Sequence, residues 1–215
     1  LYMDMYNGKA RNYFNSTLYV NPDGQKSRYD KHNLVPIVER FPFVNFFNTV
    51  DVFGWLDWGS IAGFGKGETP SSLVTDSFTT QGLICYDSVY PRWIRNFVAN
   101  GSDFITIITN DGWWGNTSGH YQHFAFARLR AIEFDRWIVR SANNGFSGII
   151  DPKGNVIIKT NYWERTGFNF QVPSKSTETL YTKFGDWLAN ICLFLIGIAL
   201  LPMYVQRIII WFFQH

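Results

Sequence analysis

The chain has 215 residues, enough for one domain and an appendage, and 46% of them are hydrophobic, which excludes global disorder. Only 17% are charged and the formal net charge is +2, so the charge balance does not indicate a nucleic-acid partner. Aromatic residues reach 19%, a content that favours boundaries between apolar and aqueous surroundings, membrane surfaces included. Residue 1 is Leu and no signal-peptide pattern follows it, so we expect the sequence to begin inside a longer protein.

The first predicted element is a β-hairpin. Residues 11–20 alternate polar and apolar side chains, residues 21–24 (Asn-Pro-Asp-Gly) have the composition of a turn, and a second extended run covers 25–35. Residues 41–67 are rich in Phe, Trp and Gly and show no clean periodicity. They indicate a long loop, which either packs on the core or serves as a lid or a membrane-dipping arm.

The middle of the chain alternates predicted strands and helices. The apolar run 103–109 is typical of a strand in a sheet that is buried on both faces. This alternation predicts a layered α/β domain. In chain order the further elements are strands at 73–78 and 81–86, a helix at 89–100, a helix at 119–136, and strands at 138–141, 145–150 and 155–159.

A transmembrane helix is predicted near the end of the chain. Segment 187–206 carries no charged residue, and as a helix its roughly twenty residues span about 30 Å, the thickness of a bilayer core. Tyr204 and Trp211 are placed as interfacial anchors. A buried core helix is the alternative, but such a helix normally carries a polar stripe. We therefore divide the chain into a domain at 1–185 and a membrane helix with its tail at 186–213.

Cys85 is the candidate nucleophile. It follows a predicted strand and precedes a predicted helix, and a helix N-terminus lowers the pKa of a thiol. Taken alone, a small buried apolar residue is the commoner role for a cysteine. Likewise, a lysine such as Lys31 is usually solvated, and Asp87 could simply cap the helix. His120 and His123 are three residues apart but have no third ligand at a suitable spacing, so no metal site is expected.

Three segments together are more specific than any single residue. The string YDKHNLVPIVE at 29–39 resembles the lysine segment of bacterial apolipoprotein N-acyltransferases, and GLICYDSVYP at 82–91 resembles their nucleophile segment. Residues 109–154 resemble the long segment that follows, and the order and spacing match over about residues 10–160. The hydrophobic tail resembles the last membrane helix of that family. The resemblance implies the nitrilase, or carbon–nitrogen hydrolase, superfamily, with an α-β-β-α sandwich and a Glu-Lys-Cys triad.

The resemblance also implies roles for five residues. Cys85 corresponds to the nucleophile and Lys31 to the cation that stabilises the oxyanion. Glu39 corresponds to an accessory carboxylate near that lysine. Tyr86 and Asp87 follow the nucleophile, where the acyltransferases commonly carry Tyr-Glu, so Asp87 keeps the charge but departs from the pattern.

The catalytic base that the resemblance implies is absent. In the family it is a Glu upstream of the lysine, whereas the only carboxylates in residues 1–30 are Asp4, Asp23 and Asp30. Most of the family's membrane helices, which also precede the lysine, are missing too. Both absences fit a truncated chain, so we expect these 215 residues alone to have no acyltransferase activity.

The reaction implied by the resemblance is a ping-pong acyl transfer at a membrane. The cysteine takes a fatty acyl chain from a phospholipid as a thioester, and the N-terminal amine of a diacylglyceryl-cysteine apolipoprotein then receives it. The expected location is the bacterial inner membrane, with the domain on the periplasmic side, and the expected state is a monomer without cofactors. Segment 41–67, with Trp55 and Trp58, is the candidate lining of the acyl entry path.

Two other functions stay open. A soluble nitrilase-type amidase shares the fold and the triad, but it has no need of a long uncharged tail. A non-catalytic, membrane-tethered module is the second alternative. The joint presence of Lys31, Glu39 and Cys85 argues against that module, whereas the absent Glu favours it.

Overall fold

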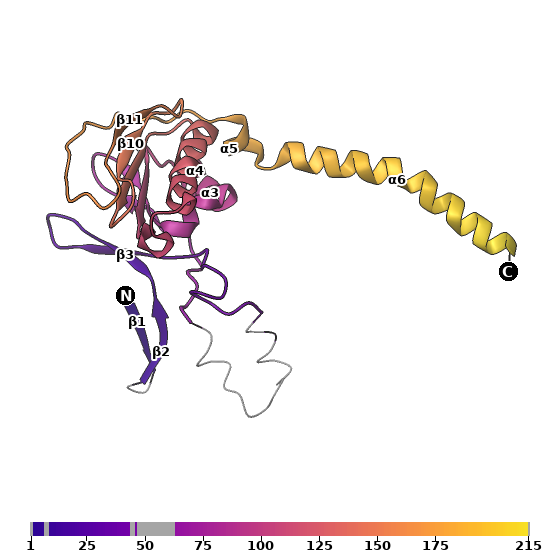
Figure 1. Cartoon of the computed structure of the whole chain (residues 1–215), viewed down its shortest axis with the longest axis horizontal. Coiled ribbons are helices and arrows are strands. Elements are labelled where there is room, and N and C mark those ends of the chain that lie inside the picture. Colours follow the sequence, from indigo (N-terminus) through magenta and orange to yellow (C-terminus); the bar gives the residue numbers. More distant parts are fainter. Residues whose placement is uncertain (1, 7–8, 44–45, 47–62, 215) are drawn as a thin grey trace.

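A five-stranded mixed sheet forms the centre of the fold (Figure 1). The structure is a computed structural model, and it describes residues 2–6, 9–43, 46 and 63–214. The strand order is β11-β10-β9-β8-β7; β7, β8 and β9 are parallel, and β10 and β11 continue the sheet antiparallel. The strands are β7 (Gly82–Ile84), β8 (Ile105–Thr109), β9 (Ile138–Ala142), β10 (Gly148–Ile150) and β11 (Val156–Lys159).

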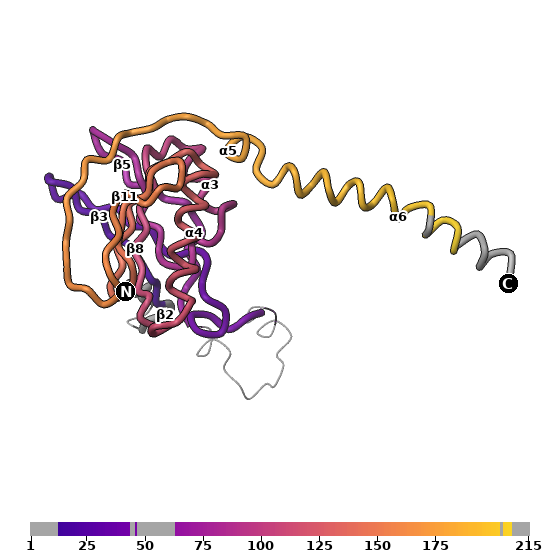
Figure 2. Tube along the Cα trace, turned by 45° about the horizontal axis from the view of Figure 1, so that its top comes forward, coloured from indigo at the N-terminus to yellow at the C-terminus, as the bar shows by residue number. Residues whose placement is uncertain are grey.

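Two helices, α3 (Pro91–Ala99) and α4 (Ser118–Phe134), lie on the same side of this sheet (Figures 1 and 2). Pro at the first position of α3 fits its start, and Gly101 with φ of 90° follows its end. The predicted helices at 89–100 and 119–136 are therefore confirmed within two residues. Two short 3₁₀ turns, η1 (Cys85–Val89) and η2 (Asp111–Trp114), directly follow β7 and β8.

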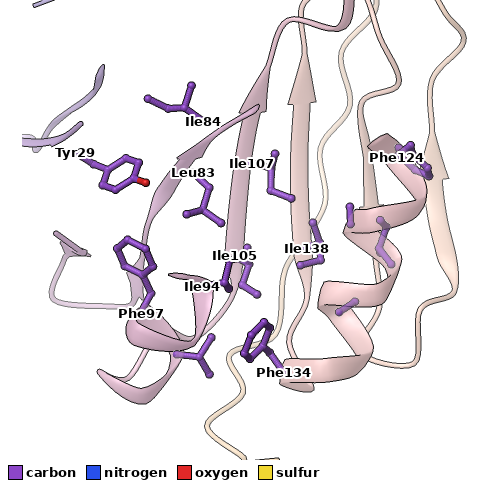
Figure 3. Packing of buried hydrophobic residues seen from close by; sticks show 14 of the residues in the cluster. Tyr29, Leu83, Ile84, Ile94, Phe97, Ile105, Ile107, Phe124, Phe134 and Ile138 are labelled. Carbon is purple, nitrogen blue, oxygen red and sulfur yellow. The ribbon is translucent and has the colours of Figure 1, made fainter. Parts of the chain in front are cut away.

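The core lies between the sheet and the two helices (Figure 3). Ile105 and Ile107 of β8 are fully buried, as the side-chain period of two predicts for one face of a strand. Ile108 points to the other face and is 43% exposed. The prediction of a sheet buried on both faces is therefore wrong at this position, because the face that carries Ile108 borders a cavity.

Two-stranded ladders precede the sheet. The predicted hairpin is confirmed around its turn, but residues 11–14 belong to a different ladder. Thr17 Oγ1 donates to the carbonyl oxygen of Gly82 at 2.9 Å and so fastens the hairpin to β7. The ladders are β1 (Tyr2–Tyr6) with β2 (Lys9–Phe14), β3 (Ser16–Val20) with β4 (Lys26–Asp30), and β5 (Leu73–Val74) with β6 (Thr79–Thr80). Most of the predicted 41–67 loop lies outside the described residues.

The C-terminal part consists of α5 (Leu180–Phe184) and the long helix α6 (Trp187–Gln214), which extends away from the sheet (Figures 1 and 2). Its stretch Trp187–Arg207 is long and apolar enough to cross a membrane, and none of the tested stretch is buried. The alternative of a buried core helix is therefore wrong.

A buried strand residue and an exposed one test how the sheet is supported. We expect Ile107→Ala to lower the free energy of unfolding by about 2–5 kcal/mol, because it opens a cavity against the helices. The control Ile157→Ala changes a 46% exposed side chain on the edge strand β11 and should cost about 0.5 kcal/mol or less. Denaturant titration in detergent solution measures both; equal costs would contradict the assigned core.

Candidate active site

The candidate site lies at the carboxyl ends of three parallel strands. Strands β7, β8 and β9 lead directly into Cys85, Asn110 and Asn143, and their in-register pairing brings these ends to one edge of the sheet. A cavity of about 310 Å³ opens there, lined by these three residues together with Glu39 and the exposed Trp113. In α/β sheets, crevices at this edge are where ligands usually bind.

The backbone of Cys85 is held in the left-handed region, with φ of 48°. For a residue other than glycine such a conformation costs of the order of 1–3 kcal/mol, so the surroundings have to fix it. The carbonyl oxygen of Cys85 lies 2.7 Å from Ser88 Oγ, which donates to it, and 3.1 Å from His123 Nε2. These contacts hold the sharp turn by which β7 passes into η1, and they leave the cysteine side chain at the cavity.

Lys31 and Glu39 form a buried ion pair. The ammonium of Lys31 is 1% exposed and donates to both carboxylate oxygens of Glu39, at 2.9 and 2.6 Å. The same carboxylate accepts from the backbone N–H of Val35 at 2.8 Å and from Asn15 Nδ2 at 3.4 Å. Because an unpaired buried ammonium would be very costly, the carboxylate fixes where the lysine can lie. The structure thus brings the side chains of these two residues, which are eight positions apart in the sequence, into direct contact.

The charge state of Cys85 is set by opposing effects. Burial raises the pKa of its thiol, whereas the positive charge of Lys31 lowers it, and the net direction is upward. The expectation that a helix N-terminus lowers this pKa is wrong. The turn η1 has only five residues, so its dipole is small beside the cost of burying a thiolate. The thiol therefore needs a base before it can act as a nucleophile.

Asp87 is buried and connects the cysteine turn, which is η1 with Cys85, to the lysine loop, which is residues 31–39 after β4. Its Oδ2 accepts from Tyr29 Oη at 2.7 Å, and its Oδ1 accepts from the backbone N–H of Asn33 at 2.7 Å. Burial raises the pKa of this carboxyl, and the hydrogen bonds from Asn33 and Tyr29 oppose the rise without cancelling it. Tyr29 and Asn33 lie on either side of Lys31 in the sequence, so Asp87 ties the lysine segment to the cysteine turn.

Tyr86 follows the nucleophile, but its ring packs edge-on against Tyr90, with 5.2 Å between ring centroids. Tyr90 borders a second cavity, of about 360 Å³, which is also lined by His32 and Asn33. The cavity beside Cys85 is lined by other side chains of the described part of the chain. The structure therefore brings Cys85 and Glu39 to one cavity and directs the Tyr86 ring elsewhere.

A polar cluster behind the cysteine was not found from the sequence. Asp111 is fully buried; its Oδ1 accepts from Thr109 Oγ1 at 2.9 Å, and its Oδ2 accepts from Arg140 Nη2 at 2.7 Å. Burial raises the pKa of Asp111, but the hydrogen bond with His123 and the charge of Arg140 outweigh it and bring the pKa to about 2. The available signal was positional, since Thr109 ends a parallel strand and Asp111 follows two residues later.

The two histidines of α4 have separate environments. His123 contacts Asp111, whereas the buried His120 stacks on Tyr162 with 4.3 Å between ring centroids. Within the residues that the structure describes, no three His, Cys, Asp or Glu side chains are grouped to hold a metal ion. Trp55 and Trp58, the sequence candidates for an acyl path, lie outside that part of the chain.

The opposing effects on Cys85 can be separated by titration. In a Cys192→Ser background, thiolate absorbance should have its midpoint above the ordinary cysteine value of 9.0, because burial disfavours the charged form. Lys31→Met should move that midpoint further up, since it removes the nearby positive charge. The control Lys26→Met, on the exposed end of β4, should leave it unchanged. A midpoint that stays in place in Lys31→Met would mean that the ammonium does not act on the sulfur.

Comparison with known proteins identifies curated relatives of this chain. The chain is 32% identical over 200 residues to an apolipoprotein N-acyltransferase of Chlorobaculum tepidum, which covers 90% of this chain and 37% of that protein. It is 34% identical over 193 residues to apolipoprotein N-acyltransferase 2 of Treponema denticola, covering 85% and 36%. The chain thus spans little more than a third of the curated relatives it matches.

The fold is also shared with solved structures. A CN-hydrolase superfamily protein of Xanthomonas campestris superposes with a TM-score of 0.52 at 20% identity, covering 76% of this chain and 57% of that one. At this identity the likeness concerns the fold alone, and it confirms the predicted α/β class. The sequence pattern of the carbon–nitrogen hydrolase family matches residues 2–180. The chain therefore belongs to the carbon–nitrogen hydrolase family.

Proposed function

We propose that this chain carries the catalytic domain of an N-acyltransferase that acts on lipids and lipoproteins. The observation that carries the proposal is the thiol of Cys85 in a cavity that it shares with Glu39, the partner of the buried Lys31 ammonium. A thiol, a fixed cation and a carboxylate are the groups that covalent acyl transfer requires. The names of the curated relatives support the same class of reaction.

The first half-reaction acylates the cysteine. A carboxylate base removes the proton from the Cys85 thiol, and the thiolate attacks the ester carbonyl carbon of a phospholipid. The C–S bond forms while the Lys31 ammonium and the backbone N–H of Tyr86 stabilise the oxyanion. The oxyanion then collapses, the ester C–O bond breaks, and the lysophospholipid alkoxide leaves with the proton that the base returns.

The second half-reaction transfers the acyl group to an amine. The α-amine of a diacylglyceryl-cysteine at the N-terminus of an apolipoprotein attacks the thioester carbonyl and loses a proton to the base. The C–N bond forms, the C–S bond breaks and the thiol of Cys85 is restored. A single cysteine therefore serves both substrates in turn, which is ping-pong kinetics.

The remaining site residues position these groups. Glu39 keeps the Lys31 ammonium in place, because both of its oxygens accept from that ammonium. Asp87 holds the lysine loop against the cysteine turn through Tyr29 and Asn33. Neither of these two roles makes Glu39 or Asp87 the base, and residues 1–30 contain no Glu. The chain alone is therefore expected to form no thioester from phospholipid.

Both proposed substrates are membrane lipids or lipid-modified proteins. As a membrane anchor, α6 would hold the domain at the membrane where these substrates lie. Its exposed apolar stretch Trp187–Arg207 fits a span across a bilayer. We place the protein in the bacterial inner membrane, with the sheet domain on the periplasmic side and acting as a monomer. A soluble amidase would have no use for such a helix.

A replacement experiment tests the activity. This chain replaces the matched segment of the Chlorobaculum tepidum relative, and the chimera is assayed for transfer of a labelled acyl chain from phospholipid to a diacylglyceryl-cysteine peptide. We expect transfer by the chimera and by its Cys192→Ala variant, and a loss of about a thousandfold or more in Cys85→Ala. Transfer that persists in Cys85→Ala, or an inactive chimera of normal folding, contradicts the proposal. The 215-residue chain assayed in parallel should be inactive.

The membrane role of α6 is tested by partition between water and a detergent phase. We expect the whole chain to enter the detergent phase, and residues 1–185 alone to stay in the aqueous phase, because the deletion removes the exposed apolar helix. Circular dichroism of the shortened chain serves as the control for folding. If both forms enter the aqueous phase, α6 is not a membrane span.

A further inference from the structure

The carbonyl oxygen of Cys85 is held by two buried side chains that do not belong to the lysine loop. His123, from the middle of α4, approaches it with Nε2 at 3.1 Å, and Ser88 Oγ donates to it at 2.7 Å. Cys85 has a left-handed φ, so its backbone rests in this position only while such contacts hold it. The histidine is therefore placed to decide the orientation of the residue that carries the sulfur.

The contacts of His123 define which ring nitrogen carries a proton. A carbonyl oxygen can only accept, so with Ser88 Oγ donating to it, a protonated Nε2 completes the hydrogen bonds at this end of the ring. On the other side of the ring, Nδ1 lies 2.9 Å from Asp111 Oδ1 and 3.1 Å from Arg140 Nη2. Nδ1 can donate to the carboxylate or accept from the guanidinium, and in both states Nε2 keeps its proton.

The ring cannot turn without breaking a buried network. Asp111 and Arg140 are ion-paired at 2.7 Å, and both are almost fully buried. The edge of Trp114 lies against the imidazole, with 5.2 Å between ring centroids. Since any rotation would leave buried polar groups without partners, the position of Nε2 is fixed relative to β8 and β9.

The same network reaches the sulfur as well as the carbonyl group. Thr109 Oγ1 donates to Asp111 Oδ1 at 2.9 Å and lines the cavity beside Cys85. Burial raises the pKa of the Cys85 thiol, and the single hydroxyl proton of Thr109 lowers it when it is donated to the sulfur in place of Asp111. One buried cluster thus contacts the nucleophile at two points, and neither point involves Lys31 or Glu39.

We propose that His123, held by Asp111 and Arg140, is a positioning residue for the nucleophile. Its Nε2–H donates to the Cys85 carbonyl oxygen and so aligns the sulfur with the incoming acyl carbonyl. This role rests on the proposed function of Cys85. It assigns no proton transfer to His123, which does not touch the reacting atoms.

Two substitutions of similar size separate this role from simple packing. The amide nitrogen of His123→Gln can reach the place of Nε2 and donate to the carbonyl oxygen, whereas the shorter His123→Asn can replace only Nδ1. His120→Gln removes the other buried imidazole of α4 and serves as the control for lost stability. All variants are made in the whole chain with Cys192→Ser, so that Cys85 is the single cysteine.

The first measurement uses cysteine labelled with ¹³C at the carbonyl carbon. We expect the Cys85 resonance to move in His123→Asn, because its carbonyl group loses a hydrogen bond, and to stay near its original position in His123→Gln and His120→Gln. In the unmutated chain, the ¹⁵N spectrum of the His123 ring should show a protonated Nε2. A neutral ring protonated only at Nδ1 overturns the proposal, whether or not the variants fold.

The second measurement is single-turnover acylation of Cys85 by p-nitrophenyl acetate at alkaline pH, where the thiolate forms without an enzymic base. We expect His123→Asn to slow acylation by about tenfold to a hundredfold through misalignment, and His123→Gln to stay within about threefold. Equal rates in Asn and Gln, or a loss matched by His120→Gln, would overturn the positioning role. If Cys85 is inert in the unmutated chain, the proposed function fails, and the ¹³C and ¹⁵N spectra alone decide on His123.

Discussion

The side chain of Lys31 is only 1% exposed, so its ammonium needs a carboxylate beside it. This requirement determines how the candidate site is arranged. Glu39 supplies both of its oxygens to Lys31, and the backbone N–H of Val35 fixes the same carboxylate. These contacts all lie within the lysine loop and hold its two ends together. Asp87 then attaches this loop to the cysteine turn. The cation thus acts on the Cys85 thiol from a place that side-chain motion in the loop cannot easily change.

The nucleophile is influenced by two parts of the fold that come from different regions of the sequence. The lysine loop contributes a positive charge, and the network of Asp111, His123 and Arg140 fixes the backbone. Burial disfavours the thiolate form of Cys85, so the sulfur keeps its proton until a base removes it. A site of this kind depends on an additional base, which explains why a reactive-cysteine geometry and an expected lack of activity are compatible in this chain.

The sequence predicted the main strands and helices well, because their periodicity is a local signal, whereas the roles of the candidate site residues remain predictions. Strand and helix periodicity gave β8, α3 and α4, and three quoted segments gave Cys85, Lys31 and Glu39 as candidates. The hydrogen-bond network behind Cys85 could not be predicted from the sequence, because Asp111, His123 and Arg140 meet only through the tertiary fold, including the register of β8 and β9. The direction of the thiol pKa was wrong for the same reason: burial, a tertiary property, outweighs the dipole of a five-residue turn.

The central claim is that Cys85 carries the acyl group between the two substrates. Its most direct test is mass spectrometry of the Chlorobaculum tepidum chimera after incubation with phospholipid in the absence of acceptor peptide. The account predicts one fatty acyl chain on the peptide that contains Cys85, removed by neutral hydroxylamine as a thioester is. An acyl chain on another residue, or acyl transfer to the acceptor with Cys85 never modified, would contradict it.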